Sequence, residues 1–203
     1  MFSSTTLEYY PYDLSNQIAA DETYIKIKGI TNYIFLFFDA IKKIITSYRV
    51  FPKRDFLSAI QASYSTLAKY LEIPDSLKFI TDGNPIYNVA NEYWRQHGYD
   101  FDLHQVIGLS NKDEISKEYR SQKQIIERLN RTLKYYYRSK GGFNSLDDAN
   151  NYMVLFATCF NFLRPHYALK YKVPVEIPAI QELPNMPAKW LKLIELSAEY
   201  MIK

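Results

Sequence analysis

Three acidic side chains stand where they could bind a divalent metal ion through their carboxylate oxygens. Asp21 opens the segment 21–29, DETYIKIKG, in which the alternation over 23–28 predicts a strand with one apolar face. Asp82 follows a short apolar segment at 77–81 and begins an Asp-Gly turn. Each aspartate taken alone is better explained as a solvated turn residue. However, both lie at predicted strand ends, where open α/β sheets collect their ligands.

The third carboxylate, Glu127, is the only acid between Tyr119 and Leu146. Helical spacing places Lys123 and Arg131 on the same face as Glu127, within a strongly basic segment. The basic candidates for binding a polyanion are Arg120, Lys123, Arg128, Arg131, Lys134 and Arg138. Ordinary pairing of charges along a helix explains Glu127 but not this excess of positive charge. The tyrosines at 135–137 either stack on bases or pack into the core.

The elements that must position these residues are recognisable from their periodicity. We expect strands at 23–28, 32–40, 44–51, 77–81 and 100–107, and helices at 54–71, 86–97, 115–138, 145–163 and 188–202. Asp55 is a predicted helix cap, and the proline-rich segment 173–187 is expected to be extended. This order matches an α/β fold of the ribonuclease-H-like type, a mixed five-stranded sheet flanked by helices. The expected division is a leader or linker at 1–19, a core at 20–170 and a C-terminal arm and helix at 171–203.

Composition sets broad limits on the class of protein. Of 203 residues, 47% are apolar, which is enough for a packed core, and the net charge of +3 is too small to identify a partner. Cys159 is the only cysteine, so no internal disulfide can form, and no Cys/His cluster suggests zinc. No apolar run approaches the roughly 20 residues of a membrane helix. We therefore expect a soluble, cytoplasmic protein.

Four sequence blocks together resemble the integrase core of bacterial insertion-sequence transposases, the DDE superfamily. Segment 21–29 resembles the strand of the first aspartate, and 81–87, TDGNPIY, resembles the block of the second. Segment 116–131 resembles the glutamate helix, and 160–169, FNFLRPHYAL, is similar to the Asn-x-x-Arg-Pro-His-x-x-Leu segment that follows the core. Each block is weak alone, but the four occur in the family's order over about residues 19 to 200.

The resemblance implies a metal-dependent enzyme that acts on DNA. Asp21, Asp82 and Glu127 would hold two Mg²⁺ (or Mn²⁺) ions, hydrolysis would free transposon 3′ ends, and transesterification would join those ends to target DNA. Glu22 is expected to point away from Asp21, as an outer or solvated residue, and Asp39 falls outside the triad. The expected partners are transposon-end and target DNA, with a homodimer or higher oligomer forming on the DNA.

The chain departs from this family at its start. Such transposases usually begin with a helix-turn-helix domain, and residues 1–19 are too short and aperiodic to form one. Three hypotheses follow: an active strand transferase, a non-catalytic remnant that binds DNA or a full-length copy, and a different nuclease on the same fold.

Overall fold

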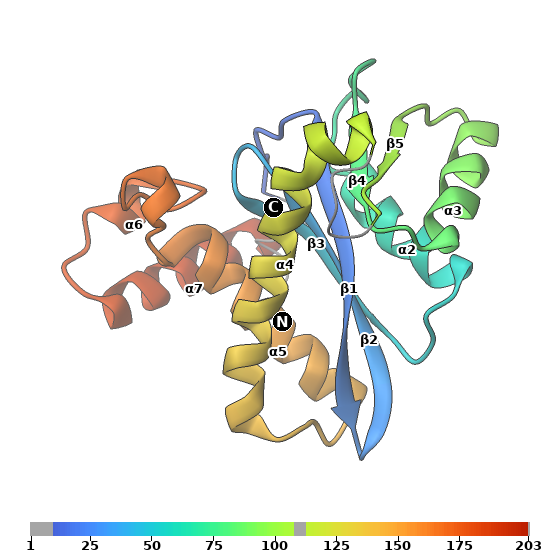
Figure 1. Ribbon diagram of the computed structural model, residues 1–203. Helices are drawn as coiled ribbons and strands as arrows, with labels where there is room; N and C mark the ends of the chain where they lie inside the picture. Colours follow the sequence, from blue (N-terminus) through green and yellow to red (C-terminus); the bar gives the residue numbers. More distant parts are fainter. Residues whose placement is uncertain (1–9, 108–112, 203) are drawn as a thin grey trace. The chain divides into compact units, whose positions relative to one another are not determined.

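The computed structural model describes residues 10–107 and 113–202 (Figure 1). The chain divides into two compact units, one of residues 14–149 and one of residues 150–203 together with 1–13. The boundaries expected from the sequence, 1–19, 20–170 and 171–203, stay a proposal. Within the described residues, no helix is long and apolar enough to cross a membrane.

A mixed five-stranded sheet forms the centre of the unit 14–149. Its strands are β1 (Gln17–Ile27), β2 (Ile30–Asp39), β3 (Ile44–Phe51), β4 (Lys78–Thr81) and β5 (Asp102–Gln105). The order across the sheet is β3-β2-β1-β4-β5, with β1, β2 and β3 antiparallel and β4 and β5 parallel to β1. The predicted ribonuclease-H-like sheet is confirmed. Strand β1 begins inside the segment expected to be a leader, because Ile18 and Ala19 are buried and pair with β4.

Helices α2 (Phe56–Leu67), α3 (Pro85–Gln96) and α4 (Glu114–Lys140) begin where side chains satisfy free backbone N–H groups. Asp55 accepts from the N–H of Ser58 as predicted, and Asp113 caps α4 by accepting from Ser116. Helix α2 ends at Leu67 rather than at residue 71, because the N–H groups of Lys69 and Tyr70 bond three residues back and tighten the turn. Gly141 ends α4 in the left-handed conformation, with φ 71°.

The helices cover opposite faces of the sheet, as the neighbouring residues of β4 show. Phe79 belongs to the main core, which also contains buried residues of α2 and α3. Ile80 packs with Tyr119 of α4 instead. Because successive side chains of a strand point to opposite faces, α4 lies across the sheet from α2 and α3 (Figure 1).

The second unit is helical in its described part. Helix α5 (Leu146–Thr158) leads into it and continues as a π-helix at Cys159–Leu163, where one uniform helix had been predicted. The backbone then turns through Tyr167–Leu169 and reaches α6 (Pro178–Gln181) and α7 (Met186–Ile202). The prediction of a wholly extended segment at 173–187 was wrong, because Pro178 occupies the first position of α6, where its missing N–H costs nothing.

Asp39 has a structural task in the turn after β2. Its buried carboxylate accepts hydrogen bonds from Ser15 N (2.6 Å), Ser15 Oγ (2.8 Å), Ile41 N (2.9 Å) and Lys42 N (2.7 Å). These donors account for its burial, since a buried carboxylate requires several hydrogen bonds.

We expect Asp39→Ala to lower the free energy of unfolding by about 3 kcal/mol, because it leaves four partly buried donors, three N–H groups and one hydroxyl, without their acceptor. Urea unfolding followed by circular dichroism measures the loss. The matched control is Asp75→Ala, at an exposed aspartate, which should change stability by less than about 0.5 kcal/mol. Equal effects of the two substitutions would contradict this assignment.

Candidate active site

The register of two parallel strands places Asp21 beside Asp82. In the β1–β4 pair, Ile18 lies opposite Phe79 and Ala19 lies opposite Ile80. Continuing this register two residues, just past the end of β4, brings Asp21 level with Asp82, and their carboxylates lie in one cluster. Alternation along β1 puts Asp21 on the face of Ala19, opposite to the face of Ile18 and therefore on the side that α4 covers. A hydrogen bond of 2.9 Å from Asn130 Nδ2 of α4 to Asp21 Oδ2 agrees with this placement.

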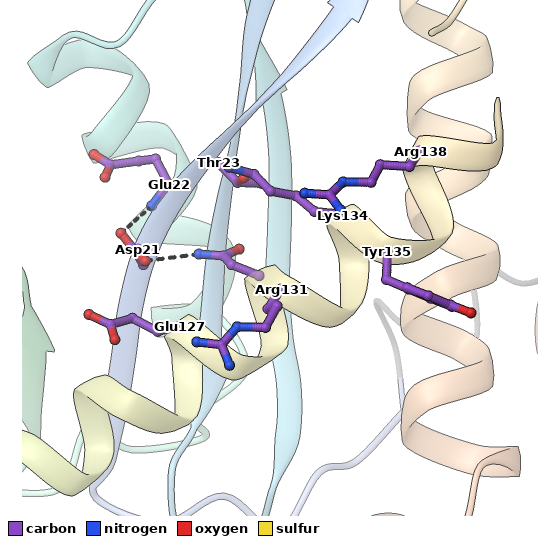
Figure 2. Close-up of a pocket in the computed structure, with 9 residues that line it drawn as sticks. Asp21, Glu22, Thr23, Glu127, Arg131, Lys134, Tyr135 and Arg138 are labelled. Carbon is purple, nitrogen blue, oxygen red and sulfur yellow. Dashed lines mark hydrogen bonds between the residues drawn. The ribbon is translucent and has the colours of Figure 1, made fainter. Parts of the chain in front are cut away.

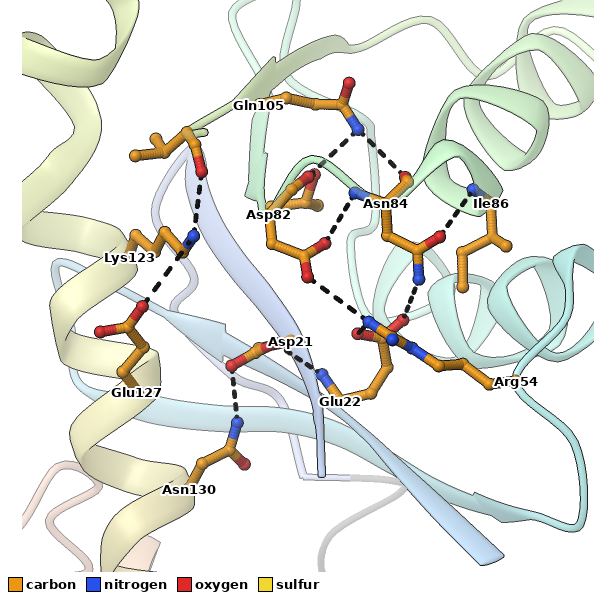
Figure 3. Close-up of polar contacts among 12 residues, drawn as sticks. Asp21, Glu22, Arg54, Asp82, Asn84, Ile86, Gln105, Lys123, Glu127 and Asn130 are labelled. Atoms are coloured by element: carbon orange, nitrogen blue, oxygen red, sulfur yellow. Dashed lines mark hydrogen bonds and ion pairs between the residues drawn. The ribbon is translucent and has the colours of Figure 1, made fainter. Parts of the chain in front are cut away.

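Asp21, Glu22 and Asp82 form an acidic cluster, with one carboxylate oxygen from each lying within 4.8 Å of the others. Glu22 was expected to point away from Asp21 as an outer or solvated residue. The solvated alternative was wrong, because its side chain is only 1% exposed, and its carboxylate lies in the same cluster as that of Asp21. It lies against Arg54, whose Nη2 is 3.0 Å from Glu22 Oε2, and it accepts from Asn84 Nδ2 at 3.3 Å (Figure 3). Although Glu22 starts from the opposite side of the strand, its carboxylate reaches the same end of the sheet.

Asp82 is held on both of its oxygens. Asp82 Oδ1 accepts from the backbone N–H of Asn84 at 3.0 Å, and Asp82 Oδ2 lies 3.4 Å from Arg54 Nη2. Gln105 Nε2 donates to the backbone carbonyls of Asp82 and Asn84, each at 3.1 Å. This turn is therefore tied both to β5 and to the acidic cluster (Figure 3).

Asp21 accepts hydrogen bonds from two amides, whereas Glu22 and Asp82 also contact the guanidinium of Arg54. The backbone N–H of Glu22 donates to Asp21 Oδ1 at 2.9 Å, in addition to the bond from Asn130. Burial raises the pKa of Asp21 to about 6, and the charges of Glu22 and Asp82 add to the rise. An all-oxygen cluster with crowded negative charge suits a hard divalent cation such as Mg²⁺, which would relieve the repulsion.

One face of α4 lines a cavity of about 520 Å³ beside the acidic cluster (Figure 2). The lining residues are Asp21, Glu22, Thr23, Glu127, Asn130, Arg131, Lys134, Tyr135 and Arg138. Glu127 thus shares the cavity with Asp21 but stands outside the acidic cluster. Its Oε1 lies 3.9 Å from Lys123 Nζ, which donates to the carbonyl of Val106 at 2.9 Å.

The six basic candidates differ in whether they line the cavity. Arg131, Lys134 and Arg138 line the cavity, and Lys134 Nζ also lies 4.2 Å from the centre of the Tyr24 ring. Lys123 is largely covered, and Arg120 and Arg128 are not part of the lining. The cavity therefore combines a carboxylate end with a cationic end.

The tyrosines at 135–137 have different environments. Tyr137 is packed: its ring stacks on Phe143, and its hydroxyl accepts from the N–H of Lys26 at 2.7 Å. Tyr135 is 73% exposed and lines the cavity, and Tyr136 is 47% exposed. Packing therefore accounts for Tyr137, and of the two exposed tyrosines Tyr135 is the one that lines the cavity.

Four polar residues of the site were not predicted as site residues. Asn130 had a local signal, since it lies three residues after Glu127 on the same helical face. Asn84 lies in the predicted turn after Asp82, but nothing there indicates that it bonds Glu22. Arg54 and the burial of Glu22 have no local signal, because they depend on contacts between segments distant in the sequence.

Comparisons with known proteins agree with this fold. Residues 113–174 match the family described as "Integrase core domain", a segment that includes Glu127 and Asn130. No protein of curated function matches the chain in sequence.

Solved structures with the same fold are integrases of retroviruses and a retroviral assembly. A chain of the simian T-cell lymphotropic virus intasome in complex with PP2A regulatory subunit B56 gamma has a TM-score of 0.58 and 16% identity. That match covers 86% of this chain and 57% of the other, so this chain spans little more than half of its length. The HTLV-2 integrase catalytic core domain in complex with magnesium (trimeric form) has a TM-score of 0.53 and 17% identity, covering 80% and 95%. The catalytic core domain of BIV integrase has a TM-score of 0.51 and 15% identity, covering 79% and 91%.

At these identities the structural likeness establishes the fold, which is that of an integrase catalytic core. With the family match over 113–174, it supports the resemblance to a DDE integrase or transposase core inferred from the sequence.

We expect Asp21→Asn to stabilise the metal-free protein at pH 7.5, by about 1–3 kcal/mol, and to give no gain near pH 4. The folded-state pKa of about 6 lies above the ordinary 3.8, so ionised Asp21 opposes folding, and stability falls as pH rises between these values. The new amide can be accommodated, because Asn130 Oδ1 is buried without a hydrogen-bond partner among the described residues.

Urea unfolding in EDTA at the two pH values measures this difference. Glu118→Gln, at an exposed acid of α4 outside the cavity lining, is the matched control and should show little change at either pH. If the Asp21→Asn variant were less stable than the wild type at pH 7.5, the idea that ionised Asp21 destabilises the folded protein would be wrong.

Proposed function

We propose that this chain contains the catalytic core of a DDE-type transposase of a bacterial insertion sequence, which cleaves DNA 3′ ends and joins them to target DNA. The observation that carries the proposal is the acidic cluster of Asp21, Glu22 and Asp82, of which Asp21 and Glu22 line a cavity that Glu127 also lines. A packed protein has no structural need for such crowding of charge. The bacterial cytoplasm is the location that this function implies.

Asp21, Asp82 and Glu127 are the proposed ligands of two Mg²⁺ or Mn²⁺ ions. Their oxygen donors fit these metals, and the pKa of Asp21 is raised by burial and then by the negative charges of Glu22 and Asp82, which a bound cation would offset. When bound, the ions supply Lewis-acid stabilisation of the attacked phosphate and lower the pKa of the attacking water or 3′-hydroxyl. Asn130 orients Asp21, and Asn84 orients Asp82, through the hydrogen bonds described above.

The cationic end of the cavity is the proposed contact with the DNA backbone. Arg131, Lys134 and Arg138 place positive charge beside the carboxylates, where a phosphate must lie for the reaction. The exposed ring of Tyr135 offers a surface on which a base can stack. Arg120, Lys123 and Arg128 complete the proposed DNA-binding set, with contributions that we expect to be smaller.

Partners are proposed from the similar structures. One of them is an intasome, and the HTLV-2 core is described with magnesium in trimeric and dimeric forms. We extend to this chain DNA as substrate, magnesium as cofactor and a dimer or higher oligomer as the working form.

The cleavage and joining activities are tested by incubating the protein with Mn²⁺, a supercoiled plasmid and a DNA duplex labelled at one end. We expect nicked plasmid and label joined covalently to it, both reduced on the order of 100-fold by Asp82→Asn or Glu127→Gln and unchanged by Glu118→Gln. Nicking without joining would indicate a different nuclease on this fold. DNA binding without either reaction would indicate a non-catalytic remnant that acts by binding DNA or a full-length copy.

Fluorescence anisotropy with a labelled duplex tests the DNA surface. Arg131→Gln and Arg138→Gln should each weaken binding a few-fold and reduce the salt slope by about 1, because each removes one phosphate contact. Arg128→Gln is the matched comparison, an exposed arginine of the same helix outside the cavity lining, and should have less than half that effect. Equal losses for all three arginines would assign binding to general charge instead of to the cavity.

A further inference from the structure

Arg54 brings a positive charge into the acidic cluster from a segment that has no other part in it. It follows β3 and directly precedes Asp55, whose side chain caps α2 by accepting from Ser58 N at 2.9 Å. That cap fixes the backbone beside Arg54. The guanidinium reaches Glu22 Oε2 at 3.0 Å and Asp82 Oδ2 at 3.4 Å through the same nitrogen, Nη2 (Figure 3).

The two contacts of Arg54 are unequal. Glu22 is buried, accepts a second hydrogen bond from Asn84, and is the closer partner. Asp82 is 27% exposed, and its contact with Arg54 is the longer. Since Asn84 N already occupies Asp82 Oδ1, Arg54 sits against the remaining oxygen, Oδ2. Arg54 can therefore leave Asp82 while it stays bound to Glu22.

We propose that Arg54 is an internal counter-cation of the acidic cluster that competes with the divalent ion for Asp82. The proposal rests on the metal site of the proposed function and assigns a regulator of its affinity. In the metal-free protein the guanidinium holds Glu22 and Asp82 close together in spite of their like charges. A divalent cation on Asp21 and Asp82 is repelled by that guanidinium, so its binding requires Arg54 to withdraw from Asp82 Oδ2.

A competing Arg54 and a purely structural Arg54 predict opposite changes in metal affinity when the arginine is removed. If Arg54 only positioned Asp82, the protein would bind the metal ion more weakly after Arg54 is removed. A competing charge gives the opposite result, because its removal leaves the same carboxylates with less positive charge beside them. The 41% exposure of the Arg54 side chain gives the displaced guanidinium direct access to water.

The proposal is tested by measuring Mn²⁺ binding to the full chain without DNA at pH 7.5. The electron paramagnetic resonance signal of free Mn²⁺ reports how much of the metal remains unbound. We expect Arg54→Gln to bind Mn²⁺ at least about fivefold more tightly than the wild type. Arg54→Lys keeps the charge and should stay within about twofold of the wild type. Arg95→Gln is the matched control, an exposed arginine of α3 paired with Glu92, and should leave Mn²⁺ affinity unchanged.

The outcomes distinguish this proposal from the proposed function. Mn²⁺ binding by the wild type with equal or weaker binding by Arg54→Gln overturns the competition and leaves the metal site standing. No Mn²⁺ binding by any of the proteins overturns both.

A second measurement uses the wild-type protein and does not depend on how the Gln variant folds. The ¹⁵N side-chain signal of Arg54, identified by its loss in Arg54→Lys, should shift when Mg²⁺ is added, because the guanidinium leaves Asp82. A signal that stays constant up to saturating Mg²⁺ would overturn the proposal.

Discussion

The parallel pairing of β1 with β4 is the constraint on which the candidate site depends. It brings together two segments that are about sixty positions apart, and it does so at one register only. A slip of one residue would turn Asp21 toward the face covered by α2 and α3 and would bury a charge in the apolar core. The apolar packing of Ile18, Ala19 and Phe79 therefore holds a register that is unfavourable for the two carboxylates it juxtaposes.

The carboxylates of the site differ in how much positive charge lies next to them. Glu22 and Asp82 share Arg54, and Glu127 lies near Lys123, whereas Asp21 accepts from amides only in the contacts described above. The carboxylate without a contacting cation among these described contacts, Asp21, is the member of the acidic cluster that also contacts α4 through Asn130. Such departures from local stability rules are typical of functional sites, and the free energy that they cost is offset by packing elsewhere in the core.

Local sequence signals predicted most of the elements. The apolar run of β2, the alternation in β1, the Asp55 cap and the Gly141 end of α4 are signals carried by residues within a turn or a strand of one another. The errors fall where distant contacts decide the outcome. Strand β1 extends back to Gln17 because β4 pairs with it, and α2 stops early although its apolar spacing continues.

The sequence by itself determined the class of fold, the strand end that carries Asp82, and the basic helix that carries Glu127. These properties follow from periodicity, capping and turn chemistry, which act between near neighbours in the chain. The sequence also predicted a strand beside Asp21, but the expectation that Asp21 lies at a strand end was wrong, because β1 begins at Gln17 and Asp21 lies inside it. Only the tertiary structure decided that Glu22 is buried in the acidic cluster, that Arg54 contacts two of its carboxylates, and which three cations of α4 line the cavity. The physical reason is that a carboxylate's partners and its hydration depend on which distant segments lie next to it, and strand pairing and helix packing set those distances.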